Sequence, residues 1–267
     1  MSVVTRIREG LGNKLFTLVH CLIVGEQYNR KALIYFSKST HERDTNYEII
    51  KYFPSTKKLI TEITKEQYEN YERNNNYLMD EEICFAKINS NVIILKGFMM
   101  LKYYLLNNEW RKWILNILKP ISLKDNKIKK TCIGIHIRVG DFLNYKEGNK
   151  VHPLYKPEYY IDIIKKYPKY SILFFTDTGQ NFIMKHILPK INNEYEFIKG
   201  NALEDLINLS KCDILILSAS TFSFWAGYLS SGVKYCPKYW LMTKIRLENS
   251  TIIDTDMYIM NDYRIYR

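Results

Sequence analysis

Hydrophobic positions in the second half of the chain alternate between short β-branched runs and longer segments with helical spacing. The runs with the length of buried strands cover residues 131–138, 171–176, 195–198 and 213–218. The intervening helices are expected after Pro157, over 182–188, from Leu203 and from Phe222. Strands and helices that alternate in this way predict a parallel sheet with helices on both faces.

The first half of the chain carries a weaker version of the same alternation. Strands are expected over residues 3–7, 31–36 and 92–98, and helices over 15–23 and 104–118. Residues 40–91 are polar and only weakly periodic, whereas the short charged segment 122–130 has no apolar pattern and is interpreted as a linker. We therefore expect an α/β protein of two Rossmann-like domains facing a cleft, residues 1–121 and 122–267.

The composition indicates a folded protein and suggests the charge of its partners. A hydrophobic content of 46% and a charged content of 25% are typical of a folded protein and exclude a disordered one. The net charge of +11 favours anionic partners, which include nucleotides, nucleic acid and an anionic membrane surface. The alternative is a basic surface that is merely well solvated.

The cysteines and the hydropathy suggest where the protein works. An odd number of widely spaced cysteines, with no C-x-x-C pair, argues against a disulfide framework and a zinc site: Cys21, Cys84, Cys132, Cys212 and Cys236. No apolar run approaches the roughly 18 residues of a membrane-spanning helix, and the N-terminus lacks the hydrophobic region of a signal peptide. We expect a cytoplasmic protein, with peripheral attachment to a membrane as a variant of that expectation.

The strand at 131–138 ends on an arginine and is followed by a Gly-Asp turn. Period-two alternation places His136 and Arg138 on the same face of this strand. Ligands of open α/β sheets bind beyond the carboxyl ends of the strands, where the planar guanidinium of Arg138 could hold a phosphate. The alternatives are a buried and satisfied imidazole for His136, a surface ion pair for Arg138, and a turn-forming role for Asp141.

A second candidate lies where the apolar run 214–217 meets small hydroxyl residues that open an apolar helix. Ser220 or Thr221 would cap this helix, and the exposed amides at its N-terminus would attract an anion. Together with Arg138, this helix end predicts a two-sided clamp for a diphosphate.

Two weaker signals complete the set. The stretch from Gly10 through Gly12 to Asn13 has neither the P-loop spacing nor G-x-G-x-x-G, but its glycines would let the backbone approach a ligand or a strand closely. Asp177 follows the run 171–176, so it is either a carboxylate in the same crevice or the N-cap of the next helix.

These motifs, taken in order, resemble the GDP-fucose-dependent fucosyltransferase superfamily, most closely its α-1,2-fucosyltransferase family, glycosyltransferase family 11. That family carries G-G-L-G-N-Q-L-F, G-[YF]-x-Q, H-x-R-R-G-D-[YF], F-S-D-D-like and N-S-T-F-S-W-W-G-A elements. The corresponding segments are residues 10–16, Gly97-Phe98, 136–142, 174–178 and 219–227. The matches span nearly the whole chain.

The resemblance implies a GT-B fold, with an acceptor-side domain over 1–121 and a donor-binding domain over 122–267. It also implies an inverting transfer from GDP-fucose to a glycan hydroxyl, with no metal and no cofactor. Arg138 would bind the β-phosphate and stabilise the departing GDP. The other donor-binding residues would be His136 beside the nucleotide, Asp177 near the guanosine, and Ser220, Thr221, Phe222 and Ser223 at the phosphate.

The resemblance leaves the general base open. A carboxylate or imidazole within about 3 Å of the acceptor hydroxyl would serve. Asp141, Glu147 and His152 lie in or just after the hallmark loop. Asp141 and His152 join Arg138 as the catalytic candidates.

Departures from the family pattern keep alternatives open. Val139 replaces the second arginine of the hallmark, and three further positions differ: Lys14, Thr178 and Ala219. The donor could therefore be another NDP-deoxyhexose, or the protein could be a weakened nucleotide-sugar-binding relative. From a different class, the charge of +11 and the 22 tyrosines raise the hypothesis of a nucleic-acid-binding protein, but the chain has no compact basic-aromatic module. We expect a nucleotide-sugar donor and a glycan acceptor as partners, and no nucleic acid.

Overall fold

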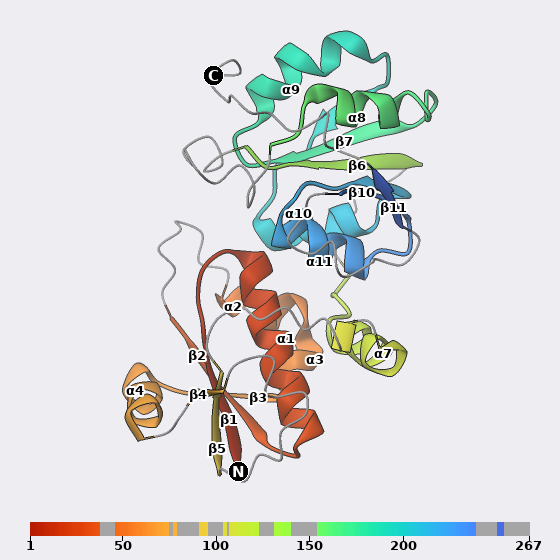
Figure 1. The fold of residues 1–267 in the computed structure, drawn as a ribbon. Coiled ribbons are helices and arrows are strands. Elements are labelled where there is room, and N and C mark those ends of the chain that lie inside the picture. The colour runs from red at the N-terminus through yellow and green to blue at the C-terminus, as the bar shows by residue number, and fades with distance from the viewer. Residues whose placement is uncertain are drawn as a thin grey trace. The chain divides into compact units, whose positions relative to one another are not determined.

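A computed structural model of the chain describes residues 1–37, 46–74, 77–78, 91–95, 104–105, 107–122, 131–139, 154–238 and 250–253. The chain divides into two compact units, Met1–Ser122 and Leu123–Arg267 (Figure 1). Each unit is built on one parallel sheet with helices packed against it.

The first unit contains a five-stranded parallel sheet in the order β3-β2-β1-β5-β4. Its strands are β1 (Ser2–Ile7), β2 (Lys31–Phe36), β3 (Ile60–Glu62), β4 (Tyr77–Leu78) and β5 (Val92–Leu95). Its helices are α1 (Leu11–Gln27), α2 (Asn46–Tyr52), α3 (Pro54–Lys57), α4 (Lys65–Asn74) and α7 (Asn108–Ile117).

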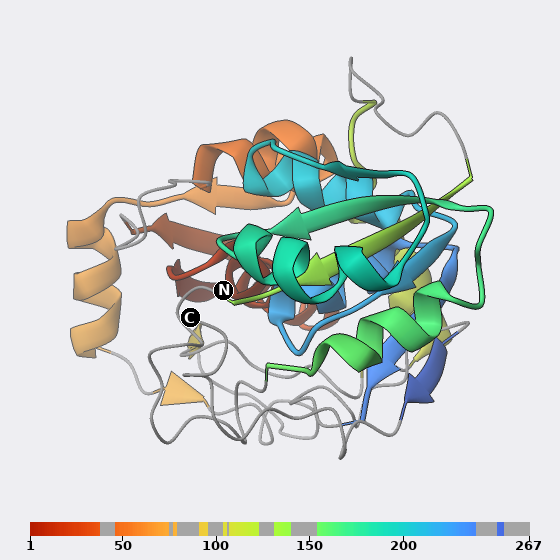
Figure 2. The same cartoon turned by 90° about the horizontal axis from the view of Figure 1, so that it is seen from above.

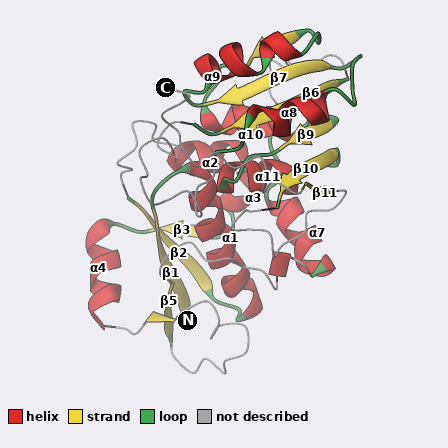
Figure 3. Cartoon of the chain, turned by 45° about the horizontal axis from the view of Figure 1, so that its top comes forward, coloured by secondary structure: helices red, strands yellow, loops and turns green. Residues whose placement is uncertain are grey.

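Successive residues of β1 point to opposite faces of this sheet, and each face has its own helix. Cys21 of α1 contacts the carbonyl of Val3 through its sulfur, at 3.9 Å. On the opposite face, Val4 packs in a buried cluster with Leu33, Ile94 and Tyr68 of α4. Figure 3 shows α1 and α4 on opposite sides of β1.

The polar segment 40–91 contains elements that the sequence pattern did not predict, namely α2, α3, β3, α4 and β4. In α4 the only buried residue is Tyr68. A helix that buries one tyrosine and packs a second, Tyr71, only partly against the core carries almost no apolar periodicity, because most of its other side chains are polar and exposed.

The second unit contains a six-stranded parallel sheet in the order β11-β10-β9-β6-β7-β8. Its strands are β6 (Cys132–Ile137), β7 (Ser171–Thr176), β8 (Tyr195–Phe197), β9 (Ile214–Ile216), β10 (Val233–Pro237) and β11 (Ser250–Ile253). Its helices are α8 (Pro157–Ile164), α9 (Gln180–His186), the 3-10 helix Leu188–Lys190, α10 (Ala202–Ser210) and α11 (Thr221–Leu229). Figure 2 shows β6 and β7 running side by side.

Helices cover both faces of the second sheet, with α8 and α9 on one side and α10 and α11 on the other (Figure 1). Every residue of the central strand β6 is buried. A strand that is covered on both faces needs apolar residues at nearly every position, which explains its continuous apolar run. At Gly134 the packing leaves no room for a side chain, because a Cβ there would lie 2.6 Å from the sulfur of Cys212.

Strands β10 and β11 were not predicted from the sequence. In β10, Lys234 is buried within an otherwise apolar strand, and its ammonium donates to the carbonyl of Gly232 at 2.8 Å. In β11, the outermost strand of the sheet, Ile252 is 45% exposed. The lysine in β10 and the solvent exposure of β11 interrupt the pattern of apolar and polar residues by which strands are recognised in a sequence.

Candidate functional site

The candidate site lies at the carboxyl ends of β6 and β7. Because Ile137 pairs with Thr176 in the parallel register, the residues that follow, Arg138 and Asp177, emerge side by side. Nε of Arg138 lies 3.3 Å from Oδ2 of Asp177, and their side chains are 35% and 25% exposed. Arg138 is therefore in an ion pair, as one of the two sequence hypotheses held, and it stays open to solvent at a sheet edge where ligands bind.

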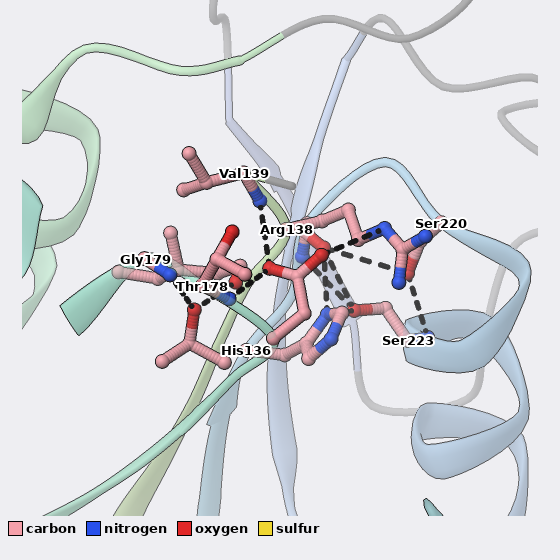
Figure 4. Close-up of polar contacts among 11 residues, drawn as sticks. His136, Arg138, Val139, Thr178, Gly179, Ser220 and Ser223 are labelled. Atoms are coloured by element: carbon pink, nitrogen blue, oxygen red, sulfur yellow. Dashed lines mark hydrogen bonds and ion pairs between the residues drawn. The ribbon is translucent and has the colours of Figure 1, made fainter. Parts of the chain in front are cut away.

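His136 lies in β6, two residues before Arg138, and is buried, with 6% exposure. Its Nδ1 lies 2.7 Å from the hydroxyl oxygens of both Ser218 and Ser223. Its ring also packs against Phe222, with ring centroids 4.8 Å apart. The imidazole thus joins β6 to the segment after β9 and to the first turn of α11, as Figure 4 shows for His136 and Ser223.

Burial fixes the charge state of this imidazole. Desolvation, reinforced by the nearby positive charge of Arg138 and opposed by Asp177, lowers the pKa of His136 from 6.5 to about 3. His136 is therefore neutral near pH 7, and the positive charge of this part of the site belongs to Arg138.

This pKa shift predicts a loss of stability in acid. The unfolded chain binds a proton at His136 near pH 6.5 and the folded chain only near pH 3, so the contribution of this group is complete above about pH 6.5 and declines as the pH falls toward 3. In His136→Asn, where an amide replaces the imidazole, we expect the free energy of unfolding to fall less steeply between these values. One proton accounts for a slope difference of up to about 1.4 kcal/mol per pH unit. Urea unfolding at a series of pH values measures it, and equal slopes in both proteins would contradict the assignment.

The N-terminus of α11 forms the second side of the site. Ser220 is its N-cap, with extended backbone (φ −139°, ψ 151°), and its hydroxyl accepts the N–H of Ser223 at 3.1 Å. The prediction that Ser220 or Thr221 caps this helix is confirmed for Ser220. Thr221 and Phe222 are partly exposed, whereas Ser223 is fully buried. The Ser223 oxygen also accepts the N–H of Ser218 at 3.1 Å, so this hydroxyl faces inward.

The turn after β7 has a different cap from the one considered in the sequence. Gly179 is the N-cap residue of α9, so Asp177 does not cap this helix. Oδ1 of Asp177 instead accepts the N–H groups of Val139, at 3.2 Å, and Thr178, at 2.8 Å. Thr176 closes the turn, because its hydroxyl donates to the carbonyl of Ile137 at 2.7 Å and accepts the N–H of Gly179 at 2.9 Å.

Val139, which stands where the family pattern has its second arginine, is 5% exposed. A Cβ on Gly179 would lie 2.8 Å from a methyl group of Val139, so this side chain packs tightly against the β7–α9 turn (Figure 4). The position therefore contributes an apolar contact where the family pattern has a cation.

The structure gathers one set of the proposed site residues in the second unit, at the ends of β6, β7 and β9 and the start of α11: His136, Arg138, Asp177, Ser220, Thr221, Phe222 and Ser223. The glycine-rich residues lie in the first unit, where Gly10 is the N-cap of α1 and Asn13 donates to Glu9 at 2.8 Å. Gly12 lies within α1. The remaining sequence candidates lie outside the described residues: Gly97, Phe98, Asp141, Glu147 and His152.

Two residues of this arrangement were missed in the sequence, Ser218 and Thr176. Ser218 is 2% exposed and contacts His136, and Thr176 ties the ends of β6 and β7 together. Each is a hydroxyl residue at the carboxyl end of an apolar run. That position in the pattern was the available signal.

The arrangement can hold an anion. A fixed guanidinium supplies directed charge-assisted donors, and a capped helix N-terminus supplies backbone amides and a favourable dipole. Among the described residues, no group of three or more His, Cys, Asp or Glu side chains could hold a metal ion. Within the same part of the chain, no helix is long and apolar enough to cross a membrane.

Comparison with known sequences identifies a family for this chain. The sequence model described as glycosyl transferase family 11 matches residues 4–240. A curated relative, the alpha-1,2-colitosyltransferase of Escherichia coli, is 28% identical over 160 residues, which cover 54% of this chain and 54% of that protein. The chain thus aligns with about half the length of this curated relative.

Two solved fucosyltransferase structures have a similar fold. NodZ from Bradyrhizobium matches with a TM-score of 0.53 at 15% identity, over 86% of this chain and 94% of that chain. POFUT1 in complex with GDP matches with a TM-score of 0.54 at 12% identity, over 86% of this chain and 96% of that chain. The α/β architecture with two parallel sheets is therefore GT-B-like, as the sequence predicted.

Proposed function

Since the chain belongs to glycosyl transferase family 11, we propose that it moves a deoxyhexose from a GDP-sugar to a glycan hydroxyl. Fucose is the sugar we propose, in an α-1,2 linkage made with inversion. The observation that carries the proposal is the position of Arg138, which Asp177 holds at the open carboxyl edge of the second sheet. The second unit is the proposed donor-binding domain and the first unit the proposed acceptor-side domain.

In the proposed reaction the acceptor oxygen attacks the anomeric carbon from the face opposite the GDP. The new C–O bond forms as the bond to the β-phosphate oxygen breaks, and the GDP leaves with the electron pair. Arg138 and the N-terminal amides of α11 would stabilise the charge that develops on the diphosphate. The acceptor hydroxyl loses its proton to a base, for which Asp141, Glu147 and His152 remain the candidates.

His136, Ser218 and Ser223 would support the phosphate-binding groups without contacting the phosphate themselves. Ser223 points inward, and the neutral His136 holds Ser218 and Ser223 in place. We therefore propose that phosphate contacts come from Arg138 and from the Ser220–Thr221 end of α11, with Ser223 as a support beneath them.

A second donor has a specific observation in its favour. The curated relative is named for transfer of colitose, a deoxyhexose that lacks the C3 hydroxyl of fucose. GDP-colitose is therefore the alternative donor. The replacement of the family's second arginine by the buried Val139, directly after Arg138, supports a donor preference that differs from that of the family pattern.

The donor class is tested by thermal shift with GDP, UDP, CMP and dTDP, followed by turnover of GDP-fucose and GDP-colitose with a panel of glycan acceptors. We expect GDP alone to stabilise the protein and GDP-fucose to be consumed. GDP binding without turnover of either donor would favour a weakened nucleotide-sugar-binding relative. RNA or DNA binding that GDP does not displace would overturn the proposal.

We also expect turnover to persist in EDTA. In the proposed mechanism a guanidinium and a helix N-terminus provide the charge stabilisation that a divalent ion supplies elsewhere. The measurement is the GDP release rate before and after chelation, with Mg²⁺ and Mn²⁺ added back separately. A loss in EDTA that either ion restores would show that the reaction depends on a metal.

A further inference from the structure

The carboxylate of Asp177 contacts the side chain and the backbone of the strand end opposite it. Oδ2 pairs with Nε of Arg138 at 3.3 Å, while Oδ1 accepts the N–H of Val139 at 3.2 Å. Asp177 thus contacts two successive residues of the strand end that carries the cation. We propose that Asp177 is a positioning residue that orients the guanidinium of Arg138 for the diphosphate.

The contact with Nε has a directional consequence. A guanidinium is planar, so holding Nε against the carboxylate restricts the directions in which its terminal N–H groups can project. Figure 4 shows the side chain of Arg138 extending from β6 toward Ser220 at the start of α11. The ion pair therefore aims the cation at the helix N-terminus that would share the anion.

The position of Asp177 is itself fixed. Its Oδ1 also accepts the N–H of Thr178 at 2.8 Å, and the adjacent Thr176 bonds to the carbonyl of Ile137 at 2.7 Å. The Thr176 bond joins β6 and β7 at their last paired residues, and the Asp177 carboxylate bridges the residues that follow. A carboxylate held by two backbone amides can orient a long side chain with little loss of its own freedom.

An oriented arginine binds an anion more tightly than a mobile one. Ordering a long side chain on binding costs conformational entropy, and this cost is removed when the side chain is already held. Partial exposure of both groups keeps the pair accessible to a ligand. Asp177 acts through Arg138 in this scheme, in contrast to the sequence hypothesis that placed it at the guanosine.

Orientation of Arg138 and contact with the guanosine predict different losses of binding when the charge of Asp177 is removed. Asp177→Asn keeps an oxygen for the amides of Val139 and Thr178 but removes the anion. If Asp177 orients Arg138, the variant binds GDP and inosine diphosphate more weakly by the same factor, about threefold to tenfold. Inosine diphosphate lacks the 2-amino group of guanine, so a carboxylate that contacted this group would make the loss larger for GDP than for inosine diphosphate.

The coupling to Arg138 is measured with a double-mutant cycle by isothermal titration calorimetry. In an Arg138→Ala background, Asp177→Asn should change GDP affinity by less than about twofold, because there is no guanidinium left to orient. Glu196→Gln, which removes an exposed carboxylate on β8, is the charge control and should leave binding unchanged. If Asp177→Asn fails to fold, Asp177→Glu takes its place, since it keeps the charge and displaces the carboxylate.

The inference rests on the proposed GDP-binding function, and the same titrations separate the two. A wild-type protein that binds no GDP contradicts the function itself. A wild-type protein that binds GDP, together with an Asp177→Asn variant of equal affinity, overturns only the positioning role. A loss that is larger for GDP than for inosine diphosphate, or one that persists undiminished without Arg138, also overturns it.

Discussion

Replacing Arg138 with alanine is expected to lower kcat for the GDP-sugar by about 10²–10³-fold. The guanidinium is the charged donor that the ends of β6 and β7 hold at the open sheet edge. The charge on the β-phosphate grows as the glycosidic bond breaks, so the loss should be larger in kcat than in GDP affinity. Steady-state rates with GDP-fucose, together with calorimetry for GDP, measure the two effects.

The control for this prediction is Lys211→Ala, which removes one exposed cation from the second unit, just after α10. A variant at Lys211 with the wild-type rate would show that the effect at Arg138 is local and does not arise from net charge. If Arg138→Ala kept the wild-type kcat, the proposed role of this residue would be wrong. Arg138→Lys should recover only part of the rate, because an ammonium lacks the planar fork.

Trp225→Ala is expected to lower the free energy of unfolding of the second unit by about 3–5 kcal/mol. Trp225 lies in α11 and is completely buried. Its ring packs at 5.5 Å from the rings of both Phe224 and Tyr228. Removal of the indole leaves a large cavity under the helix whose N-terminus forms one side of the site.

Urea unfolding followed by far-UV circular dichroism measures this loss. Trp225→Phe keeps most of the apolar volume and should lose clearly less stability than alanine. Tyr195→Ala is the aromatic control in the same unit, since Tyr195 on β8 is 51% exposed. A loss at Trp225 no larger than the loss at Tyr195 would contradict the packing described for α11.

Much of the second unit could be predicted because the burial of its strands and helices requires recognisable patterns of apolar residues in the sequence. Strand β6 is covered on both faces, so nearly every residue is apolar and the run is unmistakable. The hydroxyl residue that begins α11 predicted the cap that Ser220 forms. Helix α4 and strands β10 and β11 could not be found in this way, because polar surfaces, a buried lysine and exposed edges carry no clear period.

The site shows the same division. The residue types and their order could be recognised from the sequence: an arginine at a strand end, hydroxyl residues at a helix start and the series of motifs that marks the family. The partners of these residues became visible only in the folded protein, because β6 and β7 pair in a register that places Arg138 beside Asp177, 39 residues further along the chain. It also decided that His136 is buried and neutral, because desolvation depends on what packs around a side chain. Residue types and local periodicity can be seen in the sequence. Contacts between distant segments, and the burial of their side chains, exist only once the sheet has formed.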